Sequence, residues 1–243
     1  MHRFYADESG TQDGLVRLGE EDAHHAARVL RMKPGDAAEV FMHGKRFSAE
    51  IASMEGAVTL RLLVELPSTE ARLRVTLYQG LPKADKLDFI AQKLTELGAA
   101  RIVPVKMERC VVKLDGRDGE KRRERLQKIA REAAKQCKRA RAPEICAPGS
   151  WKELKGALAG HDLLLVPWED ASGFGMQAAR EQFPQARDIG VVIGPEGGMS
   201  AAEVEALVAL GAKPLRLGPR ILRTETAAVA SCALAMLLWG DLG

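Results

Sequence analysis

The spacing of apolar and polar residues changes character near residue 70. Before that point, every second residue is apolar in three short segments: 38–41, 46–51 and 58–63. Hairpin-type turns separate these segments at 43–45 and 55–56, which predicts antiparallel strands. A stretch with helical periodicity over 21–32 precedes them, and the turn 33–36 (KPGD) closes it,. Residues 1–70 are therefore expected to form a small β-barrel domain.

After a linker at 66–69 (LPST), apolar runs alternate with stretches of helical periodicity. Strands are predicted over 73–79, 101–105, 162–167, 189–194 and 214–217. A helix is predicted over 85–97, because its apolar residues recur on one face and Gly98 follows it,. Strands that alternate with helices are typical of a mostly parallel sheet. The sequence thus predicts an α/β domain over 71–243.

Two glycine-rich turns each follow one of the predicted strands. The first, 194–198 (GPEGG), leads into a helix that starts at Ser200, with Glu203 as the second member of a capping box,. The second, 217–226 (LGPRILRTET), leads into an apolar helix. The first turn alone is equally consistent with a tight connection and with a ligand site, but the second favours a ligand crevice at the carboxyl ends of the strands. Neither matches the dinucleotide or triphosphate fingerprints.

The second turn carries the side chains that are best suited to ligand binding or catalysis. Arg220 and Arg223 have the planar guanidinium that suits a phosphate or a pyrimidine edge,. Glu225 has two interpretations, and the residues alone favour complementing the helix dipole over catalysis. The following segment, 227–239, is apolar nearly all round, so we expect it to be buried on every side by its own core or by a partner subunit,. We favour a dimer interface.

Charge is distributed unevenly along the 243 residues. Residues 1–70 hold 8 Lys/Arg against 12 Asp/Glu, although the chain as a whole has a net charge of +3. A predicted helix over 120–141 contains ten Lys/Arg and three Asp/Glu. A charged helix is usually a solvated surface, but this imbalance supports a phosphate-facing role equally well. Lys135, Lys138 and Arg139 are its candidate RNA contacts.

The predicted N-terminal helix offers a second basic face, with His24, Arg28 and Arg31 at positions i, i+4 and i+7,. Lys33 is nearby, and this face is a further candidate for contact with RNA. No third ligand is placed beside the histidines, so no metal site is expected. The four cysteines form no C-x-x-C pair, and no signal region opens the chain,. We expect a soluble cytoplasmic protein with reduced thiols and no membrane span.

Four segments together resemble the RsmE family, the bacterial 16S ribosomal RNA uridine N3-methyltransferases of the SPOUT superfamily. They are 24–36 (HHAARVLRMKPGD), 92–98 (QKLTELG) with 108–110 (ERC), 193–198 (IGPEGG) and 217–227 (LGPRILRTETA). The resemblance implies a PUA-like N-terminal barrel and a C-terminal α/β domain with a trefoil knot. It also implies a homodimer, S-adenosylmethionine as cofactor, and 16S rRNA of the small ribosomal subunit as partner, with a decoding-region uridine as target.

On this interpretation individual residues receive expected roles. The cofactor would be held by Leu165, Gly194, Glu196, Gly197, Gly198, Leu217, Gly218, Ile221, Leu222 and Thr224. Arg223, and next Arg220, would stabilise the uridine anion, and Glu225 or Glu196 would accept the N3 proton. RNA would contact His24, Arg28, Arg31, Lys33, Arg109, Lys135, Lys138 and Arg139.

Three alternatives remain beside this interpretation. A ribose 2′-O-methyltransferase of the same superfamily tends to carry a Ser-Leu-Asn motif where the final helix begins, and this chain has RTET at 223–226 instead. A non-catalytic RNA-binding or ribosome-assembly factor needs the basic helix but not two glycine-rich loops. A Rossmann-type methyltransferase is disfavoured, because its glycine-rich first turn is reduced to one Gly in 78–83 (YQGLPK).

Overall fold

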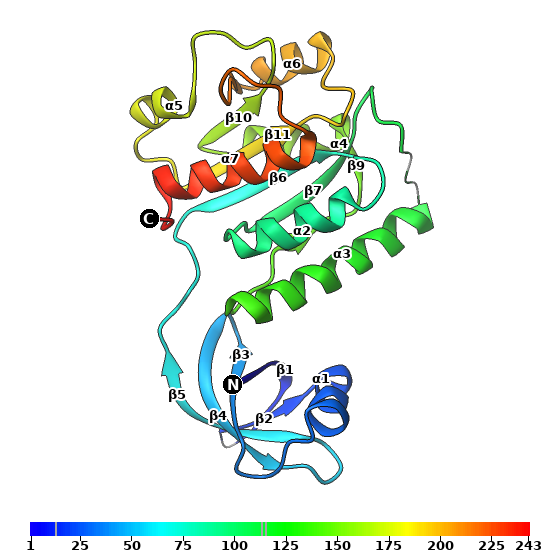
Figure 1. Ribbon diagram of the computed structural model, residues 1–243, viewed down its shortest axis with the longest axis vertical. Coiled ribbons are helices and arrows are strands. Elements are labelled where there is room, and N and C mark those ends of the chain that lie inside the picture. Colours follow the sequence, from blue (N-terminus) through cyan, green and yellow to red (C-terminus); the bar gives the residue numbers. More distant parts are fainter. Residues whose placement is uncertain (13, 113, 115) are drawn as a thin grey trace. The chain divides into compact units, whose positions relative to one another are not determined.

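The computed structural model (Figure 1) describes residues 1–12, 14–112, 114 and 116–243. The chain divides into two compact units. One comprises residues 1–70 and 134–141, and the other comprises residues 71–133 and 142–243.

The first unit is a closed barrel with the strand order β1-β2-β5-β4-β3. Its strands are β1 (His2–Gln12), β2 (Leu15–Leu18), β3 (Ala37–Met42), β4 (Lys45–Ser53) and β5 (Thr59–Leu66). The last three confirm the predicted hairpins, whereas β1 and β2 were not predicted. β1 completes the barrel because it pairs antiparallel with β2 and parallel with β3. Apolar side chains fill the interior, among them Phe4, Val40 and Leu60, all with no exposed surface.

The helix predicted over 21–32 is shorter than expected. It consists of α1 (Glu20–His24) and a π-helical turn η1 (His25–Val29), after which Arg31 adopts a φ of 53°. The wider turn is closed by the bond from the Leu30 N–H to the His25 carbonyl,. Ala26 is fully buried in the barrel core. The prediction that His24, Arg28 and Arg31 share one helical face is therefore wrong, since Arg31 lies beyond the helix.

The second unit contains a seven-stranded sheet among the described residues, with the order β12-β10-β11-β6-β7-β8 and β9 beside β7. Its strands are β6 (Arg74–Gly80), β7 (Arg101–Lys106), β8 (Glu144–Ile145), β9 (Gly149–Ser150), β10 (Leu163–Pro167), β11 (Asp188–Ile193) and β12 (Lys213–Leu215). Each strand pairs in parallel with its neighbours. The predicted α/β class is confirmed, and only the two-residue strands β8 and β9 were not anticipated.

Helices cover both faces of this sheet. They are α2 (Lys86–Glu96), α3 (Gly116–Cys137), α4 (Trp151–Ala159), α5 (Met176–Gln182), α6 (Ala201–Val208) and α7 (Thr224–Trp239). α2 and α6 confirm the predicted helices, including the capping box of Ser200 with Glu203. α3 ends before residue 141 because Lys138 takes a φ of 68°. α4 and α5 were not predicted. No helix of the described residues is long and apolar enough to cross a membrane.

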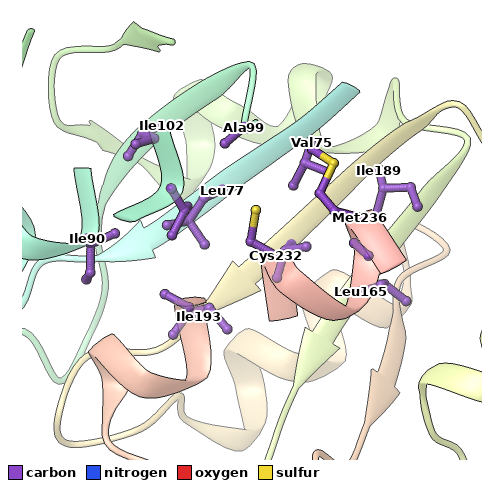
Figure 2. Packing of buried hydrophobic residues seen from close by; sticks show 14 of the residues in the cluster. Val75, Leu77, Ile90, Ala99, Ile102, Leu165, Ile189, Ile193, Cys232 and Met236 are labelled. Atoms are coloured by element: carbon purple, nitrogen blue, oxygen red, sulfur yellow. The ribbon is translucent and has the colours of Figure 1, made fainter. Parts of the chain in front are cut away.

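The pleat of the strands divides the core into two layers. On one face, α7 contributes Cys232 and Met236, which pack over residues of the central strands such as Val75 and Ile189 (Figure 2). The intervening residues, such as Val192, pack against α6 on the other face. The outer face of α7 is less covered, and Leu237 is 56% exposed. The expectation of burial on every side is thus not met within the chain.

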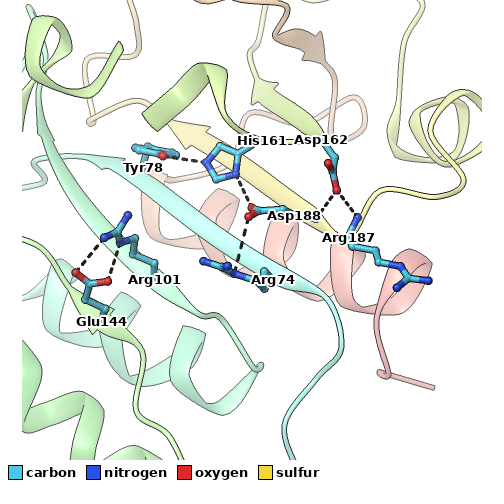
Figure 3. A network of polar contacts seen from close by, with 8 residues as sticks. All are labelled: Arg74, Tyr78, Arg101, Glu144, His161, Asp162, Arg187 and Asp188. Carbon is cyan, nitrogen blue, oxygen red and sulfur yellow. Dashed lines mark hydrogen bonds and ion pairs between the residues drawn. The ribbon is translucent and has the colours of Figure 1, made fainter. Parts of the chain in front are cut away.

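A polar network fastens the amino ends of the central strands (Figure 3). The ring of His161 bonds Tyr78 Oη at 2.9 Å through Nε2 and Asp188 Oδ1 at 2.6 Å through Nδ1. The ring fits over Gly190, where an added Cβ would lie 2.6 Å from it. Burial raises the pKa of Tyr78 to about 12, so its hydroxyl stays protonated,. The carboxyl ends of the strands are thereby left for the candidate site.

Candidate active site

A cavity of about 420 Å³ opens at the carboxyl ends of β10 and β11. Both glycine-rich loops line it, and its lining residues are Lys86, Pro167, Glu169, Ile193, Gly194, Pro195, Glu196, Gly197, Gly198, Met199, Ile221, Leu222, Arg223, Thr224 and Ala227. A smaller pocket of about 90 Å³ shares Pro167, Glu169, Ile221, Leu222 and Ala227 with it. The two hollows therefore adjoin each other.

The first loop needs its glycines for close backbone packing. A Cβ on Gly194 would lie 3.0 Å from the carbonyl carbon of Gly198, which itself has a φ of 71°. A Cβ on Gly80, at the end of β6, would lie 2.6 Å from the ring of Pro195. The Gly198 N–H closes the turn onto the Pro195 carbonyl at 2.9 Å. The loop is thus folded tightly against the ends of β6 and β11.

Two polar side chains link the first loop and the helix after it to neighbouring segments. Arg109 Nη1 donates to the Gly197 carbonyl at 3.1 Å. Glu203 is buried, and its Oε1 accepts from the Glu108 N–H at 2.9 Å and from Trp151 Nε1 at 2.7 Å. These bonds join the start of α6 to the segment after β7. Arg109, an expected RNA contact, therefore supports the first loop.

The second loop ends where α7 begins, with Arg223 as the N-cap residue. Arg220, Ile221 and Arg223 are exposed. Thr224 is buried, and its Oγ1 donates to the Gly194 carbonyl at 2.7 Å, which ties the second loop to the first. The loop therefore presents its arginines to the solvent side of the cavity while its end is anchored.

A cluster of charges crosses from α2 to both loops. Lys86 Nζ lies 2.9 Å from Glu196 Oε1 and 3.3 Å from Glu225 Oε2. Glu196 Oε1 also accepts the Lys83 N–H at 3.0 Å. Burial by itself would raise the pKa of Glu196, but the Lys86 ammonium and the backbone donors outweigh it and lower that pKa. The pKa of Lys86 is raised, chiefly by its bond to Glu196. Both groups are therefore charged at neutral pH.

The structure brings most of the predicted cofactor and catalytic residues to the site. Eight line the main cavity: Gly194, Glu196, Gly197, Gly198, Ile221, Leu222, Arg223 and Thr224. Leu217, Gly218 and Arg220 line the smaller pocket. Leu165 is fully buried within β10 and is absent from both linings, and Glu225 reaches the site through Lys86.

Three residues at the site were not predicted from the sequence: Lys86, Glu169 and Gln79. Lys86 and Glu169 line the cavity, and Gln79 Nε2 donates to Thr224 Oγ1 at 2.8 Å. Lys86 lies after the carboxyl end of β6, just as the predicted site residues lie after β11 and β12. This position is the only sequence feature that marks Lys86 as a site residue. Glu169 likewise follows β10. Gln79 is a polar residue at the end of an apolar strand, and this feature of the sequence could have identified it.

The expected RNA contacts on the basic helix are corrected in part. Lys135 Nζ bonds Asp22 Oδ1 at 2.6 Å, and Arg139, 6% exposed, pairs with Glu70 at 2.9 Å. A buried, ion-paired guanidinium is not a surface for phosphate, so the prediction for Arg139 is wrong, and Lys135 is committed to the barrel unit. Lys138 remains exposed.

The other expected RNA contacts of the barrel unit stay available. His24, Arg28, Arg31 and Lys33 are all exposed. Within the described part of the chain, no group of three or more His, Cys, Asp or Glu side chains is arranged to hold a metal ion.

Comparisons with known proteins agree along the chain. Residues 69–236 match the family model of the RNA methyltransferase domain, and residues 18–63 match that of the RNA methyltransferase PUA domain. Ribosomal RNA small subunit methyltransferase E of Bacillus subtilis is 38% identical over 85% of this chain and 84% of its own. The Mycobacterium tuberculosis protein of the same name is 30% identical over 94% of this chain and 88% of its own.

Solved structures agree over nearly the full length. A putative methyltransferase of Legionella pneumophila in complex with S-adenosylmethionine has a TM-score of 0.87 and 33% identity, and covers 99% of this chain and 98% of its own. A ribosomal RNA small subunit methyltransferase E of Neisseria gonorrhoeae bound to S-adenosylmethionine has a TM-score of 0.86 and 31% identity, with full coverage of both chains.

Proposed function

The chain belongs to the ribosomal RNA small subunit methyltransferase E family, and on that premise we propose that it methylates N3 of a uridine in 16S rRNA. S-adenosylmethionine is the methyl donor, as the solved relatives that contain it indicate. The observation that supports this proposal most strongly is the cavity formed jointly by the two glycine-rich loops. The choice of N3, and of a decoding-region uridine, rests on the family likeness.

The residues of the cavity fit this cofactor. A side chain on Gly198 would run into the carboxylate of Glu169, which lines the cavity, so the bare backbone there lets a ligand approach the main chain closely,. Ile221 and Leu222 supply apolar surface of the kind that receives an adenine ring,. Glu169 and Glu196 place carboxylates beside a ligand that carries a positive charge. When bound, S-adenosylmethionine supplies a methyl group activated by its sulfonium.

The chain's own residues supply the remaining chemistry. Loss of the N3 proton places negative charge on the carbonyl oxygens of uracil, and a guanidinium stabilises that charge. Arg223, exposed at the cavity and anchored at the N-cap of α7, takes this role, with Arg220 next to it in the smaller pocket. Glu196 or Glu225 accepts the proton. Positioning of the base against the cofactor provides much of the rate.

The proposal extends to partners and topology. The barrel unit binds rRNA, and its exposed residues His24, Arg28 and Arg31 support this. A homodimer forms through α7, whose outer face leaves Leu237 uncovered. The chain end threads a trefoil knot, as the family likeness implies. Action on ribosomal subunits places the protein in the cytoplasm.

A single assay tests the function. Methyl transfer from labelled S-adenosylmethionine to small ribosomal subunits that lack this modification is followed by mass spectrometry of the nucleosides. We expect 3-methyluridine as the product. A ribose-methylated nucleoside would overturn the mechanism but keep the cofactor. No transfer, together with no cofactor binding, would favour the non-catalytic RNA-binding alternative.

A further inference from the structure

Lys86 joins three elements of the site through one ammonium group. It is the first residue of α2, it lines the cavity, and its side chain is 28% exposed. Glu196 from the first loop lies 2.9 Å away, and Glu225 from the first turn of α7 lies 3.3 Å away. Both carboxylates thus fix the position of a cation that lines the cavity.

The Lys86 ammonium keeps one N–H donor that is not directed at either carboxylate. A lysine carries three N–H donors and no acceptor. At most two of these donors serve the ion pairs with Glu196 Oε1 at 2.9 Å and Glu225 Oε2 at 3.3 Å, and Glu225 Oε2 accepts no hydrogen bond from the described residues. A third donor is left for a ligand in the cavity that Lys86 lines. The pKa of Lys86 is raised, chiefly by its bond to Glu196, so the ammonium is protonated before the reaction begins.

The charged residues that line the cavity complement the hydrogen-bonding pattern of the imide edge of uracil. Its N3–H donor lies between two carbonyl acceptors, so a matching surface needs one acceptor and two donors. Glu196 supplies a carboxylate in the cavity lining, and Lys86 and Arg223 supply two cationic donors in the same lining. Cytosine presents an acceptor at N3 and a donor at the neighbouring amine, which the same carboxylate and ammonium would oppose.

We propose that Lys86 is a catalytic residue that donates a hydrogen bond to a carbonyl oxygen of the target uracil while N3 is deprotonated. The inference rests on the proposed function and deepens it by assigning a second electrophile beside Arg223. Such a donor also selects uracil over cytosine. A single preorganised donor of this kind is worth a factor of about 10²–10³ in kcat.

The chemical step balances with the groups named. The N3–H bond breaks, its proton passes to the Glu196 carboxylate, and the nitrogen electron pair forms the bond to the methyl carbon. The electron pair of the sulfur–methyl bond stays on sulfur, and S-adenosylhomocysteine is the second product. Protonation of Glu196 removes one negative neighbour from Lys86, which strengthens the pull of the ammonium on the uracil oxygen. Lys86 itself keeps its proton.

Three variants test the assignment: Lys86→Met, Lys86→Arg and the matched control Lys93→Met. Lys93 is on the same helix and pairs with Glu96 at 2.9 Å, but it does not line the cavity. Turnover is measured on small subunits, and S-adenosylmethionine binding is measured separately by calorimetry. We expect Lys86→Met to lose about 10²–10³ in kcat with cofactor affinity retained, Lys86→Arg to recover part of the rate, and Lys93→Met to match the wild type.

A second substrate distinguishes catalysis from a structural role. Small subunits with 5-fluorouridine at the target position have a more acidic N3–H, so their anion needs less stabilisation. The deficit of Lys86→Met should shrink by about tenfold on this substrate. An undiminished deficit would overturn the inference, as would wild-type turnover in Lys86→Met. If the wild type itself forms no 3-methyluridine, the proposed function fails first.

If Lys86→Met does not fold, Lys86→Arg decides the question through the same comparison. A conservative variant that is misaligned with the uracil oxygen should be slower on uridine than on 5-fluorouridine relative to the wild type. If Lys86→Arg has reduced turnover, and the ratio of its turnover to that of the wild type is the same on uridine and on 5-fluorouridine, Lys86 has a structural role only. That result would overturn the inference.

Discussion

The side-chain amide of Gln79 donates a 2.8 Å hydrogen bond to the hydroxyl oxygen of Thr224. That hydroxyl donates in turn to the Gly194 carbonyl at 2.7 Å. Gln79 is fully buried and Thr224 is 6% exposed, so water does not compete for these bonds. One chain of bonds therefore connects the end of β6, the first loop and the first residue of α7.

We predict that this chain of bonds sets the affinity of the cofactor site. Gln79→Leu removes the donor to Thr224 Oγ1, and Thr224→Val removes the 2.7 Å donor to the Gly194 carbonyl. Each variant therefore deletes a buried hydrogen bond worth about 0.5–1.5 kcal/mol in the free energy of unfolding. Because the two loops then lose their mutual alignment, cofactor affinity should fall as well. The two variants should not be additive, with a coupling energy of about 0.5–3 kcal/mol in a double-mutant cycle.

Thr95→Val is the control for those variants. Thr95 is also fully buried, and its Oγ1 donates to the Ala91 carbonyl at 2.6 Å within α2. Its loss should lower stability without changing cofactor affinity, as calorimetry can show. Additive effects of Gln79→Leu and Thr224→Val on cofactor binding would contradict the predicted coupling.

A second prediction separates binding from chemistry at Arg223. Arg223→Ala should lower kcat by about 10²-fold or more, since it removes a donor that acts on charge developed during the reaction. Cofactor affinity should stay near that of the wild type, because the side chain is exposed and the N-cap role belongs to the backbone. Arg187→Ala, at the opposite end of the sheet, is the control. Full turnover in Arg223→Ala would show that another group stabilises the anion.

The sequence predicted those parts of the fold whose signals are local. Strands β10 and β11 are continuous apolar runs, and the glycine-rich loops after β11 and β12 interrupt the pattern sharply, so both were found. The capping box at Ser200 needs only residues three apart, and it was also found. Such signals depend on neighbours along the chain and require no knowledge of tertiary contacts.

The parts that were missed depend on contacts between distant segments. Gln79 and Thr224 are 145 residues apart, so no periodicity links them. The sequence predicted Lys135 to be a solvated or RNA-facing cation, whereas in the structure it forms an ion pair with Asp22. β1 has few apolar residues, and it is a strand because the barrel offers it partners on both sides. Tertiary context decided each of these cases.

A third prediction concerns the end of the basic helix. Arg139→Glu places like charge beside Glu70 in a buried site, so it should destabilise the protein strongly in denaturant titrations,. Lys138→Glu changes an exposed side chain and should leave stability unchanged. If Lys138 contacts a phosphate, binding of small subunits should weaken and the salt slope should fall by about one. If the salt dependence of binding does not change, Lys138 makes no contact with a phosphate and this end of the helix has a structural role only.

The ion pair of Lys86 with Glu196 predicts a pH dependence of stability. The pKa of Glu196 is lowered in the folded state, because Lys86 and the backbone donors outweigh the effect of burial. A lowered carboxyl pKa adds stability above the unfolded pKa, and this contribution is lost as pH falls through the folded pKa. The difference in the free energy of unfolding between wild type and Glu196→Gln should therefore shrink in acid. Denaturant titrations of the two proteins at a series of pH values measure this difference.

The last prediction uses the network at the amino ends of the strands to separate stability from function. Tyr78→Phe removes the hydrogen bond to His161 Nε2 while the ring volume is kept. The His161 side chain is 8% exposed, so its nitrogen is left without an adequate replacement, at a cost of about 1–3 kcal/mol,. Denaturant titration should show this loss.

Cofactor affinity should nevertheless stay unchanged in Tyr78→Phe, because the lost bond is made to His161 at the amino end of β10, whereas the cavity lies at the carboxyl ends of β10 and β11. His161→Ala should destabilise more, since it also empties the space over Gly190,. A change in cofactor affinity at a temperature where both variants remain folded would contradict this separation. It would mean that the strand ends are coupled through the sheet, with Tyr78 next to Gln79 in β6 as the point of transmission.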